Sequence, residues 1–166
     1  MTTDLLIMTL NEIDGVKKIM PQIKKEWVDN ILVVDGGSTD GTIEEAKKLG
    51  IEVIHQTNRG EGNACRIGVE NTTSDFIIFF SPDGNDEPEE IPKMIEKISN
   101  DFDIVHISRF GQNSDSEDAG LIDRFGNRMF TFLANCFFGG KLTDTLFGFK
   151  IIKKKVSGEK NDYNGT

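Results

Sequence analysis

From residue 33 the sequence reads Val33-Val34-Asp35-Gly36-Gly37-Ser38-Thr39-Asp40-Gly41-Thr42. The apolar run 31–34 predicts a buried strand that ends at the carboxylate of Asp35. Two glycines and several small polar residues follow, and a helical pattern begins at Thr42. In an open α/β sheet, this order places an acidic side chain at the carboxyl end of a strand, where such sheets bind ligands. Because Ser38, Thr39 and Asp40 supply groups that cap the turn, we expect the Asp35 carboxylate to be spare for a ligand.

A second apolar run, 76–80, ends in Ser81-Pro82-Asp83-Gly84-Asn85. Carboxyl ends of parallel strands meet at one edge of a sheet, so the two acidic turns predict one polar site that holds a nucleotide. Mg²⁺ or Mn²⁺ prefers one or two carboxylates together with phosphate oxygens. We therefore expect Asp83 and Asn85 to be metal ligands, with Asp86 and Glu87 as further candidates; the alternative is a solvated Asp-Gly turn.

The remaining pattern alternates strands with helices. Strands are predicted at 5–10, 51–55 and 103–108, and helices at 16–27, 42–49, 62–71, 88–98 and 123–138. Pro21 is expected to kink or restart the first helix. The alternation predicts an α/β fold, a Rossmann-type, mostly parallel sheet with helices on both faces. We expect one domain over 1–152, with a polar loop at 110–120, and a polar, disordered tail over 153–166.

Composition excludes several classes of function. The chain has 166 residues and a formal net charge of −9, which argues against a general nucleic-acid binder. Cys65 and Cys136 lack metal-ligand spacing and are expected to be free in a reducing compartment. The sequence has no apolar run of the ~18 residues that a membrane-spanning helix needs, and its start does not resemble a signal peptide. We expect a cytoplasmic protein, with at most peripheral membrane contact.

A Gly-x-Gly follows the strand predicted at 51–55, in Arg59-Gly60-Glu61-Gly62. Cys65 stands where the dinucleotide fingerprint has its third glycine, which argues against a dehydrogenase. Arg59 and Arg66 are candidates to flank a phosphate; an exposed salt bridge is an equally good interpretation.

Arginines also gather later in the chain. Arg109 follows the strand predicted at 103–108, while Arg124 and Arg128 are four residues apart and share one helix face. Guanidinium groups bind phosphate with two hydrogen bonds, so these side chains are candidates to hold an anionic substrate, although a solvated helix face fits equally well. Asp144 lies in an apolar, glycine-containing segment and is a candidate base or organiser of a phosphate site, or else caps a turn.

Five segments in order resemble the family 2 glycosyltransferases of the GT-A fold, most of all the dolichol-phosphate mannosyltransferase type that transfers sugars to polyprenyl phosphates. The segments are Thr9-Leu10-Asn11-Glu12, 33–42, 58–66, Arg124-Phe125-Gly126-Asn127-Arg128 and 143–150. The resemblance runs from about Leu5 to Lys150.

The resemblance implies transfer of a sugar, with inversion, from a GDP- or UDP-linked donor to a polyprenyl phosphate. Asp83 and Asp144 would be the catalytic residues, and Asp83 would bind Mg²⁺ or Mn²⁺. Arg109, Arg124 and Arg128 would hold the acceptor phosphate. The donor nucleotide would contact Thr9, Asn11, Glu12, Asp35, Gly37, Ser38, Arg59, Gly62 and Arg66.

The sequence departs from the family pattern at several positions. Gly36 replaces the second of two aspartates, Ser81 replaces the first aspartate of the Asp-x-Asp motif, and Glu61 replaces a basic residue. Three alternatives therefore remain open: a glycan or glycolipid acceptor, a nucleotide-sugar-binding module without catalysis, and action with a membrane-protein partner.

Overall fold

The computed structural model describes residues 1–58, 60–99, 102–107 and 148–154. The chain divides into one compact unit of residues 1–105 and 149–166 and a second unit of residues 106–148. Several predicted features lie outside the described residues: the loop 110–120, the helix 123–138, most of the tail, and the side chains of Arg59, Arg109, Arg124, Arg128 and Asp144.

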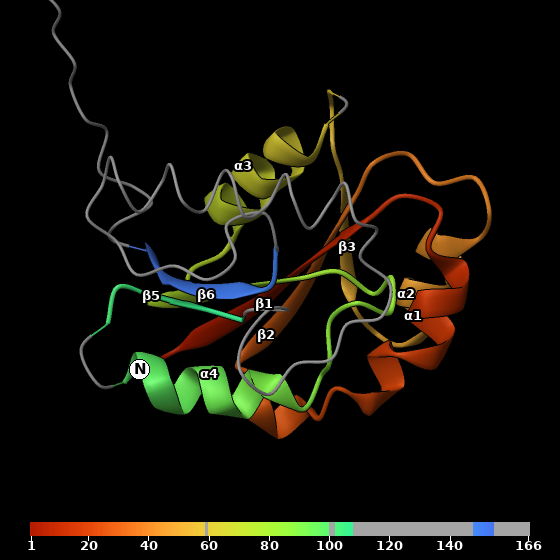
Figure 1. Cartoon of the computed structure of the whole chain (residues 1–166). Helices are drawn as coiled ribbons and strands as arrows, with labels where there is room; N and C mark the ends of the chain where they lie inside the picture. The colour runs from red at the N-terminus through yellow and green to blue at the C-terminus, as the bar shows by residue number, and fades with distance from the viewer. Residues whose placement is uncertain (59, 100–101, 108–147, 155–166) are drawn as a thin grey trace, which may run out of the picture. The chain divides into compact units, whose positions relative to one another are not determined.

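A six-stranded sheet has the order β3-β2-β1-β4-β6-β5 (Figure 1). Its strands are β1 (Thr3–Thr9), β2 (Asn30–Asp35), β3 (Glu52–His55), β4 (Phe76–Phe80), β5 (Ile104–His106) and β6 (Lys150–Lys153). Strands β1 to β4 pair in parallel, whereas β6 pairs antiparallel with β4. The mostly parallel sheet is confirmed. Strand β6 is not predicted from the sequence, because its two isoleucines lie between lysines and form too short an apolar run to indicate a strand.

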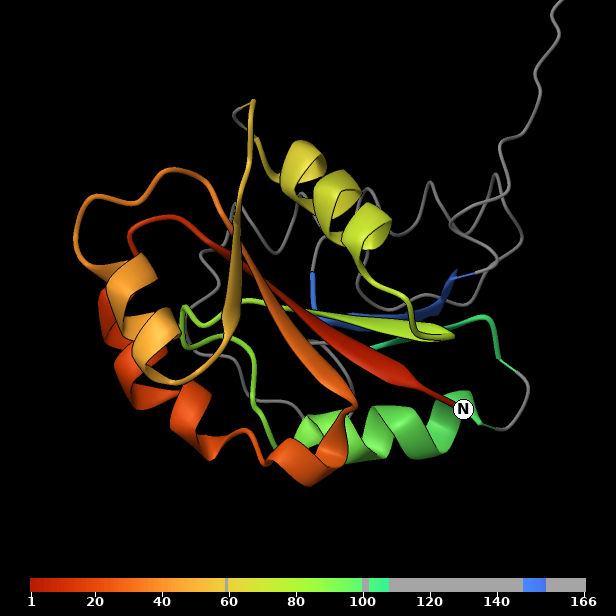
Figure 2. The same cartoon turned by 180° about the vertical axis from the view of Figure 1, so that it is seen from behind.

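The helices are α1 (Ile13–Lys18), α2 (Thr42–Lys48), α3 (Glu61–Asn71) and α4 (Glu90–Ile98), with 3₁₀ turns η1 (Met20–Gln22) and η2 (Lys25–Trp27). The helix predicted over 16–27 is interrupted at Pro21, where a kink or restart is expected: α1 ends at Lys18, Pro21 lies in η1 because its missing N–H cannot continue an α-helix, and η2 follows. Helices α3 and α4 lie on opposite faces of the sheet in both views (Figures 1 and 2), as the sequence predicts.

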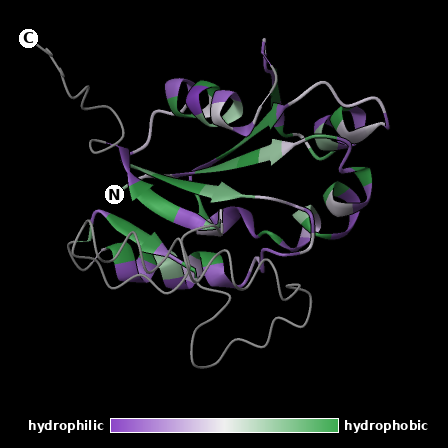
Figure 3. Ribbon diagram, turned by 45° about the horizontal axis from the view of Figure 1, so that its top comes forward, coloured by the Kyte–Doolittle hydropathy of each residue, from purple (hydrophilic) through white to green (hydrophobic). Residues whose placement is uncertain are grey.

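The core beneath α3 combines residues of the sheet and the helix. A cluster of buried side chains forms it: Leu6, Leu32, Val34, Ala64, Ile67, Ile77 and Phe79. The strands are accordingly the most hydrophobic part of the ribbon (Figure 3). Gly68 lets the helix approach closely, since a Cβ there would lie 2.3 Å from Cδ2 of Leu6. The packing of these apolar side chains holds the strands in place and so fixes the positions of the loops that follow them.

Candidate active site

The parallel strands β1 to β4 end at one edge of the sheet. In their register, Asp35 of β2 lies between Thr9 of β1 and His55 of β3, and Phe80, the last residue of β4, pairs with Ile7. Among the predicted donor-site residues that the structure describes, Thr9 and Asp35 end β1 and β2, and Asn11, Glu12, Gly37 and Ser38 lie in the loops that follow. The other two, Gly62 and Arg66, lie on α3.

Asp35 is completely buried, and its carboxylate organises the turn that follows β2. Oδ1 accepts hydrogen bonds from the backbone N–H groups of Gly37 and Ser38, both at 2.8 Å. Oδ2 accepts from the hydroxyls of Thr9 at 2.8 Å and Ser38 at 2.5 Å. Burial alone would raise the pKa of Asp35, but the bonds from Ser38, Thr9 and Gly37 outweigh it and hold the pKa below its ordinary value. The expectation of a spare carboxylate is therefore wrong, because both oxygens serve the turn.

Side chains also join the loop after β1 to the loop after β2. The backbone N–H of Asn11 donates to Ser38 Oγ at 2.8 Å, and Asn11 Oδ1 accepts from the N–H of Thr39 at 2.9 Å. Asn11 has a φ of 58°, a left-handed conformation that asparagine tolerates better than most residues. The backbone N–H of Glu12 donates to Thr42 Oγ1 at 2.9 Å. Asn11 and Ser38 thus fix the shape of the predicted nucleotide site, and their contact with a nucleotide stays a prediction.

The loop after β4 is held in a tight turn beside α1. Asp83 Oδ1 accepts from the N–H of Asn85 at 2.9 Å, and Gly84 has a φ of 93°. Asp86 is buried and accepts from the N–H of Ser81 at 2.7 Å. Asp86 was a further candidate for a metal ligand, but its carboxylate instead closes the turn by accepting this hydrogen bond.

Gly15 lets α1 lie directly against this loop. A Cβ at position 15 would be 1.8 Å from the carbonyl oxygen of Pro82, closer than any side chain allows. The contact brings Glu12, which precedes α1, near Asp83 from the end of β4. No pattern in the sequence indicates the importance of Gly15, since only the packing shows why this position must lack a side chain.

Negative charge gathers where Glu12, Asp40 and Asp83 approach one another. The pKa of Glu12 is raised, first by burial and then by the charges of Asp83 and Asp40. A carboxyl group in this environment gains from a cation that offsets its charge.

We expect Glu12→Gln to raise the unfolding temperature at pH 7, because it removes a carboxylate whose ionisation the fold disfavours. A pKa that is higher in the folded state destabilises the protein above that pKa, and the effect vanishes below the ordinary value of 4.5. The advantage of the variant in thermal melts should therefore disappear as the pH falls through that range. Glu26→Gln, a change at an exposed position in η2, is the control; a lower unfolding temperature of Glu12→Gln at pH 7 would contradict the charge argument.

The carboxylates of Glu12 and Asp83 would hold a divalent cation only together with oxygen atoms of a bound substrate, such as those of a diphosphate. Among the residues that the structure describes, no three His, Cys, Asp or Glu side chains form a metal-binding group. Mg²⁺ is commonly held by one or two carboxylates plus substrate phosphates, and Glu12 and Asp83 match that requirement. Both belong to loops at the edge where a phosphate would arrive.

Two of the predicted donor-site residues, Gly62 and Arg66, lie on helix α3. Nη1 of Arg66 pairs with Glu70 Oε1 at 2.8 Å, and both side chains are 57% exposed, which matches the salt-bridge interpretation. Gly62 lies in the first turn of α3 with open space around it, and Gly37 has a φ of 98° with open space as well. A role of Gly37, Gly62 or Arg66 in binding a nucleotide stays a prediction.

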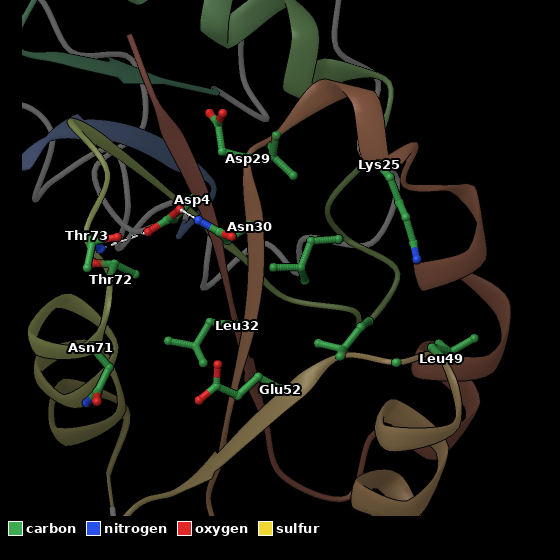
Figure 4. Close-up of a pocket in the computed structure, with 14 residues that line it drawn as sticks. Asp4, Lys25, Asp29, Asn30, Leu32, Leu49, Glu52, Asn71, Thr72 and Thr73 are labelled. Atoms are coloured by element: carbon green, nitrogen blue, oxygen red, sulfur yellow. Dashed lines mark hydrogen bonds between the residues drawn. The ribbon is translucent and has the colours of Figure 1, made fainter.

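A hollow of about 460 Å³ lies at the opposite edge, at the amino ends of β1 and β2 (Figure 4). Asp4 in its wall is buried, and its oxygens accept hydrogen bonds from Asn30, Thr73 and Ser74. Asp29 accepts from the N–H of Thr3 at 2.7 Å. These acids hold the strand starts together, so the carboxyl edge remains the candidate site.

The sequence matches the family described as glycosyl transferase family 2 over residues 4–159. It is 30% identical over 152 residues to the glycosyltransferase AglJ of Haloferax volcanii, covering 91% of this chain but 50% of that protein. It is 27% identical to the UDP-N-acetylglucosamine–dolichyl-phosphate N-acetylglucosaminyltransferase of Methanococcus voltae, covering 92% of this chain and 69% of that protein. The chain thus spans half the length of the first relative.

Solved structures share the fold. Glucosyl-3-phosphoglycerate synthase from Mycobacterium tuberculosis, crystallised with Mn²⁺, UDP-glucose and glycerol 3-phosphate, superposes with a TM-score of 0.74 at 19% identity. The superposition covers 93% of this chain and 57% of that one. The expected GT-A fold is therefore confirmed. None of the helices in the described part of the chain combines the length and apolar composition that crossing a membrane requires.

Proposed function

The chain belongs to glycosyl transferase family 2, and from that membership we propose that it transfers a hexose from a nucleoside diphosphate sugar to a polyprenyl phosphate. The Methanococcus voltae relative and a dolichyl-phosphate hexose transferase of Haloferax volcanii, 27% identical over 150 residues, are named for dolichyl-phosphate acceptors. Such an acceptor is anchored in a membrane, so we propose action at the cytoplasmic face of a membrane. A donor carrying UDP is favoured by the name of the first of these relatives.

One observation carries the donor half of the proposal. Glu12 after β1 and Asp83 after β4 approach each other across the contact of α1 with Pro82, and the charge of Asp83 adds to burial in raising the pKa of Glu12. The carboxylates of Glu12 and Asp83 and the turn that Asp35 closes thus lie at the carboxyl edge of the sheet, where α/β sheets bind nucleotides. A bound Mg²⁺ or Mn²⁺ would offset the charge that develops on the leaving diphosphate.

The residues of this chain would act mainly by positioning. Asp35 and Asn11 hold the two loops in a fixed shape, so little reorganisation is needed when the donor binds. A phosphate acceptor is already an anion and needs little help from a general base. For the acceptor we keep the predicted roles of Arg109, Arg124 and Arg128 in binding phosphate and of Asp144 in ordering that site.

The first test is a calorimetric titration of UDP and GDP, with and without Mn²⁺. We expect metal-dependent binding of one nucleotide by the wild type and a loss of affinity of at least about tenfold in Asp83→Ala, because one of the two carboxylates that would hold the metal is gone. The variant loses the bond from Asn85 N–H to Asp83, but it also loses the repulsion between Glu12 and position 83, so its unfolding temperature should change little.

Asp103→Ala is the matched control, since Asp103 is an exposed aspartate that precedes β5 and approaches Lys153 at 4.0 Å. It should bind nucleotide as the wild type does. Binding that is indifferent to both Mn²⁺ and Asp83 would remove the assigned metal role, and an absence of nucleotide binding under all conditions would refute the proposed donor site.

A further inference from the structure

Lys150 is the first residue of β6 and lies at the carboxyl edge of the sheet, although it is far in sequence from the loops at that edge. In the antiparallel register it pairs with Phe79, one residue before the end of β4, whereas Lys153 pairs with Phe76 at the opposite edge. The strand therefore brings a positive charge to the point where β4 leads into the turn of Asp83.

The side chain of Lys150 lies on the face of the sheet that α3 covers. Side chains paired across neighbouring strands share a face, and Phe79 belongs to the buried cluster beneath α3. Nζ of Lys150 lies over the ring of Phe79, 5.4 Å from its centroid. On α3, burial raises the pKa of the Cys65 thiol and the charge of Glu61 adds to this effect, while the charge of Lys150 opposes it. The ammonium group thus lies between the end of β4 and the first turns of α3.

This ammonium group forms no ion pair with a carboxylate in the part of the chain that the structure describes. Other basic side chains do form such pairs: Lys48 with Glu45, Lys93 with Glu90, Lys153 with Asp103, and Arg66 with Glu70. Lys150 is only partly exposed, and the contact that replaces an acid is the face of an aromatic ring. A positive charge partly removed from water gains from an anionic oxygen that pairs with it.

We propose that Lys150 binds a phosphate oxygen of a substrate, an inference that rests on the proposed function and adds a residue to it. Glu12 and Asp83 make this edge negative, so an arriving phosphate needs positive charge from elsewhere. The ammonium group is a compact charge with three N–H donors, which suits a phosphate oxygen. The phosphate is that of the donor diphosphate or that of the acceptor, since both would arrive at this edge and the contact has the same chemistry.

The test measures the binding of UDP and of geranyl phosphate, a short isoprenyl phosphate, each with Mn²⁺, to the wild type, Lys150→Gln and Lys150→Arg by calorimetry. We expect Lys150→Gln to lower the affinity for one of these ligands at least about tenfold, the effect of one charge-assisted hydrogen bond. A loss for UDP alone assigns Lys150 to the donor, a loss for geranyl phosphate alone assigns it to the acceptor, and a loss for both places it between the two phosphates. Lys150→Arg keeps the charge and should retain most of the affinity.

Lys153→Gln is the matched control, because Lys153 belongs to the same strand at the opposite edge and approaches Asp103 at 4.0 Å. It should bind both ligands as the wild type does. Uridine, which has no phosphate, should bind equally well to Lys150→Gln and to the wild type. The unfolding temperature of Lys150→Gln should stay close to that of the wild type, since only the contact with the ring of Phe79 is lost.

Unchanged affinity of Lys150→Gln for both phosphate ligands would overturn the inference and leave the proposed function intact. Equal losses for UDP and uridine would also overturn it, because they would show that Lys150 supports the shape of the site and not a phosphate. If the wild type binds neither UDP nor geranyl phosphate, the proposed function itself fails.

Discussion

Asp35→Ala is expected to lower the free energy of unfolding by about 3–5 kcal/mol, the cost typical of breaking a buried, charged hydrogen-bond network. The substitution leaves the hydroxyls of Thr9 and Ser38 and the N–H groups of Gly37 and Ser38 without their acceptor. Domains of this kind have a total stability of only about 5–15 kcal/mol, so the variant should be close to unfolding. Chemical denaturation followed by circular dichroism measures the loss.

Asp4→Ala is the matched control, since Asp4 is an equally buried aspartate with a comparable hydrogen-bond set at the opposite edge of the sheet. It should lose stability while the folded fraction binds nucleotide normally, whereas Asp35→Ala should lose both. Because the pKa of Asp35 is lower in the folded state, its contribution is present above the ordinary value of 3.8 and is lost as the pH falls through the folded pKa. Asp35→Asn should therefore show a weaker acid dependence of stability, and an unchanged one would contradict the assignment.

Gly15→Ala is expected to cost about 3 kcal/mol, at the upper end for overpacking, because the added methyl group would overlap a backbone carbonyl that cannot rotate away. The Cβ would lie 1.8 Å from the oxygen and 2.8 Å from the carbon of the Pro82 carbonyl. Separation of α1 from the loop would also move Glu12 away from Asp83, so nucleotide affinity should fall together with stability. Thermal melts and calorimetric titration measure the two effects.

Gly62→Ala is the control for the glycine substitution. Gly62 is also helical, but no atom lies within 4 Å of the position that an added methyl group would take, so alanine should stabilise α3 by up to about 1 kcal/mol through its helix propensity. Equal stability of the two variants would show that the contact between α1 and Pro82 relaxes without cost.

The sequence predicted the architecture because the apolar runs are strong and alternate with helical patterns. The runs that became β2 and β4 are bounded by turn residues, and the structure confirms both within one residue. In the run 16–27, Pro21 predicts an interruption, but the helical spacing does not show that the α-helix begins at Ile13 and that only 3₁₀ turns follow its end at Lys18. Strand β6 could not be predicted, because its two apolar residues are too few to form a periodic pattern.

The candidate site was predictable only in part. Strand-end logic places Glu12, Asp35 and Asp83 at one edge, and the structure agrees. Hydrogen-bond partners depend on loop conformation. The sequence therefore could not show that the carboxylates of Asp35 and Asp86 accept hydrogen bonds within their own turns. The close approach at Gly15 is a property of packing, which a local pattern does not encode.

The antiparallel strand β6 has a consequence for how the chain folds during synthesis. Residues 150–153 pair with β4 along most of its length, from Phe76 to Phe79, although they are made long after it. Until they emerge from the ribosome, one edge of β4 presents unpaired backbone groups next to Ile77, Ile78 and Phe79, an arrangement that invites pairing with other chains. Strand β6 therefore covers this edge of β4, and its late synthesis prolongs the time in which the edge is open to pairing with other chains.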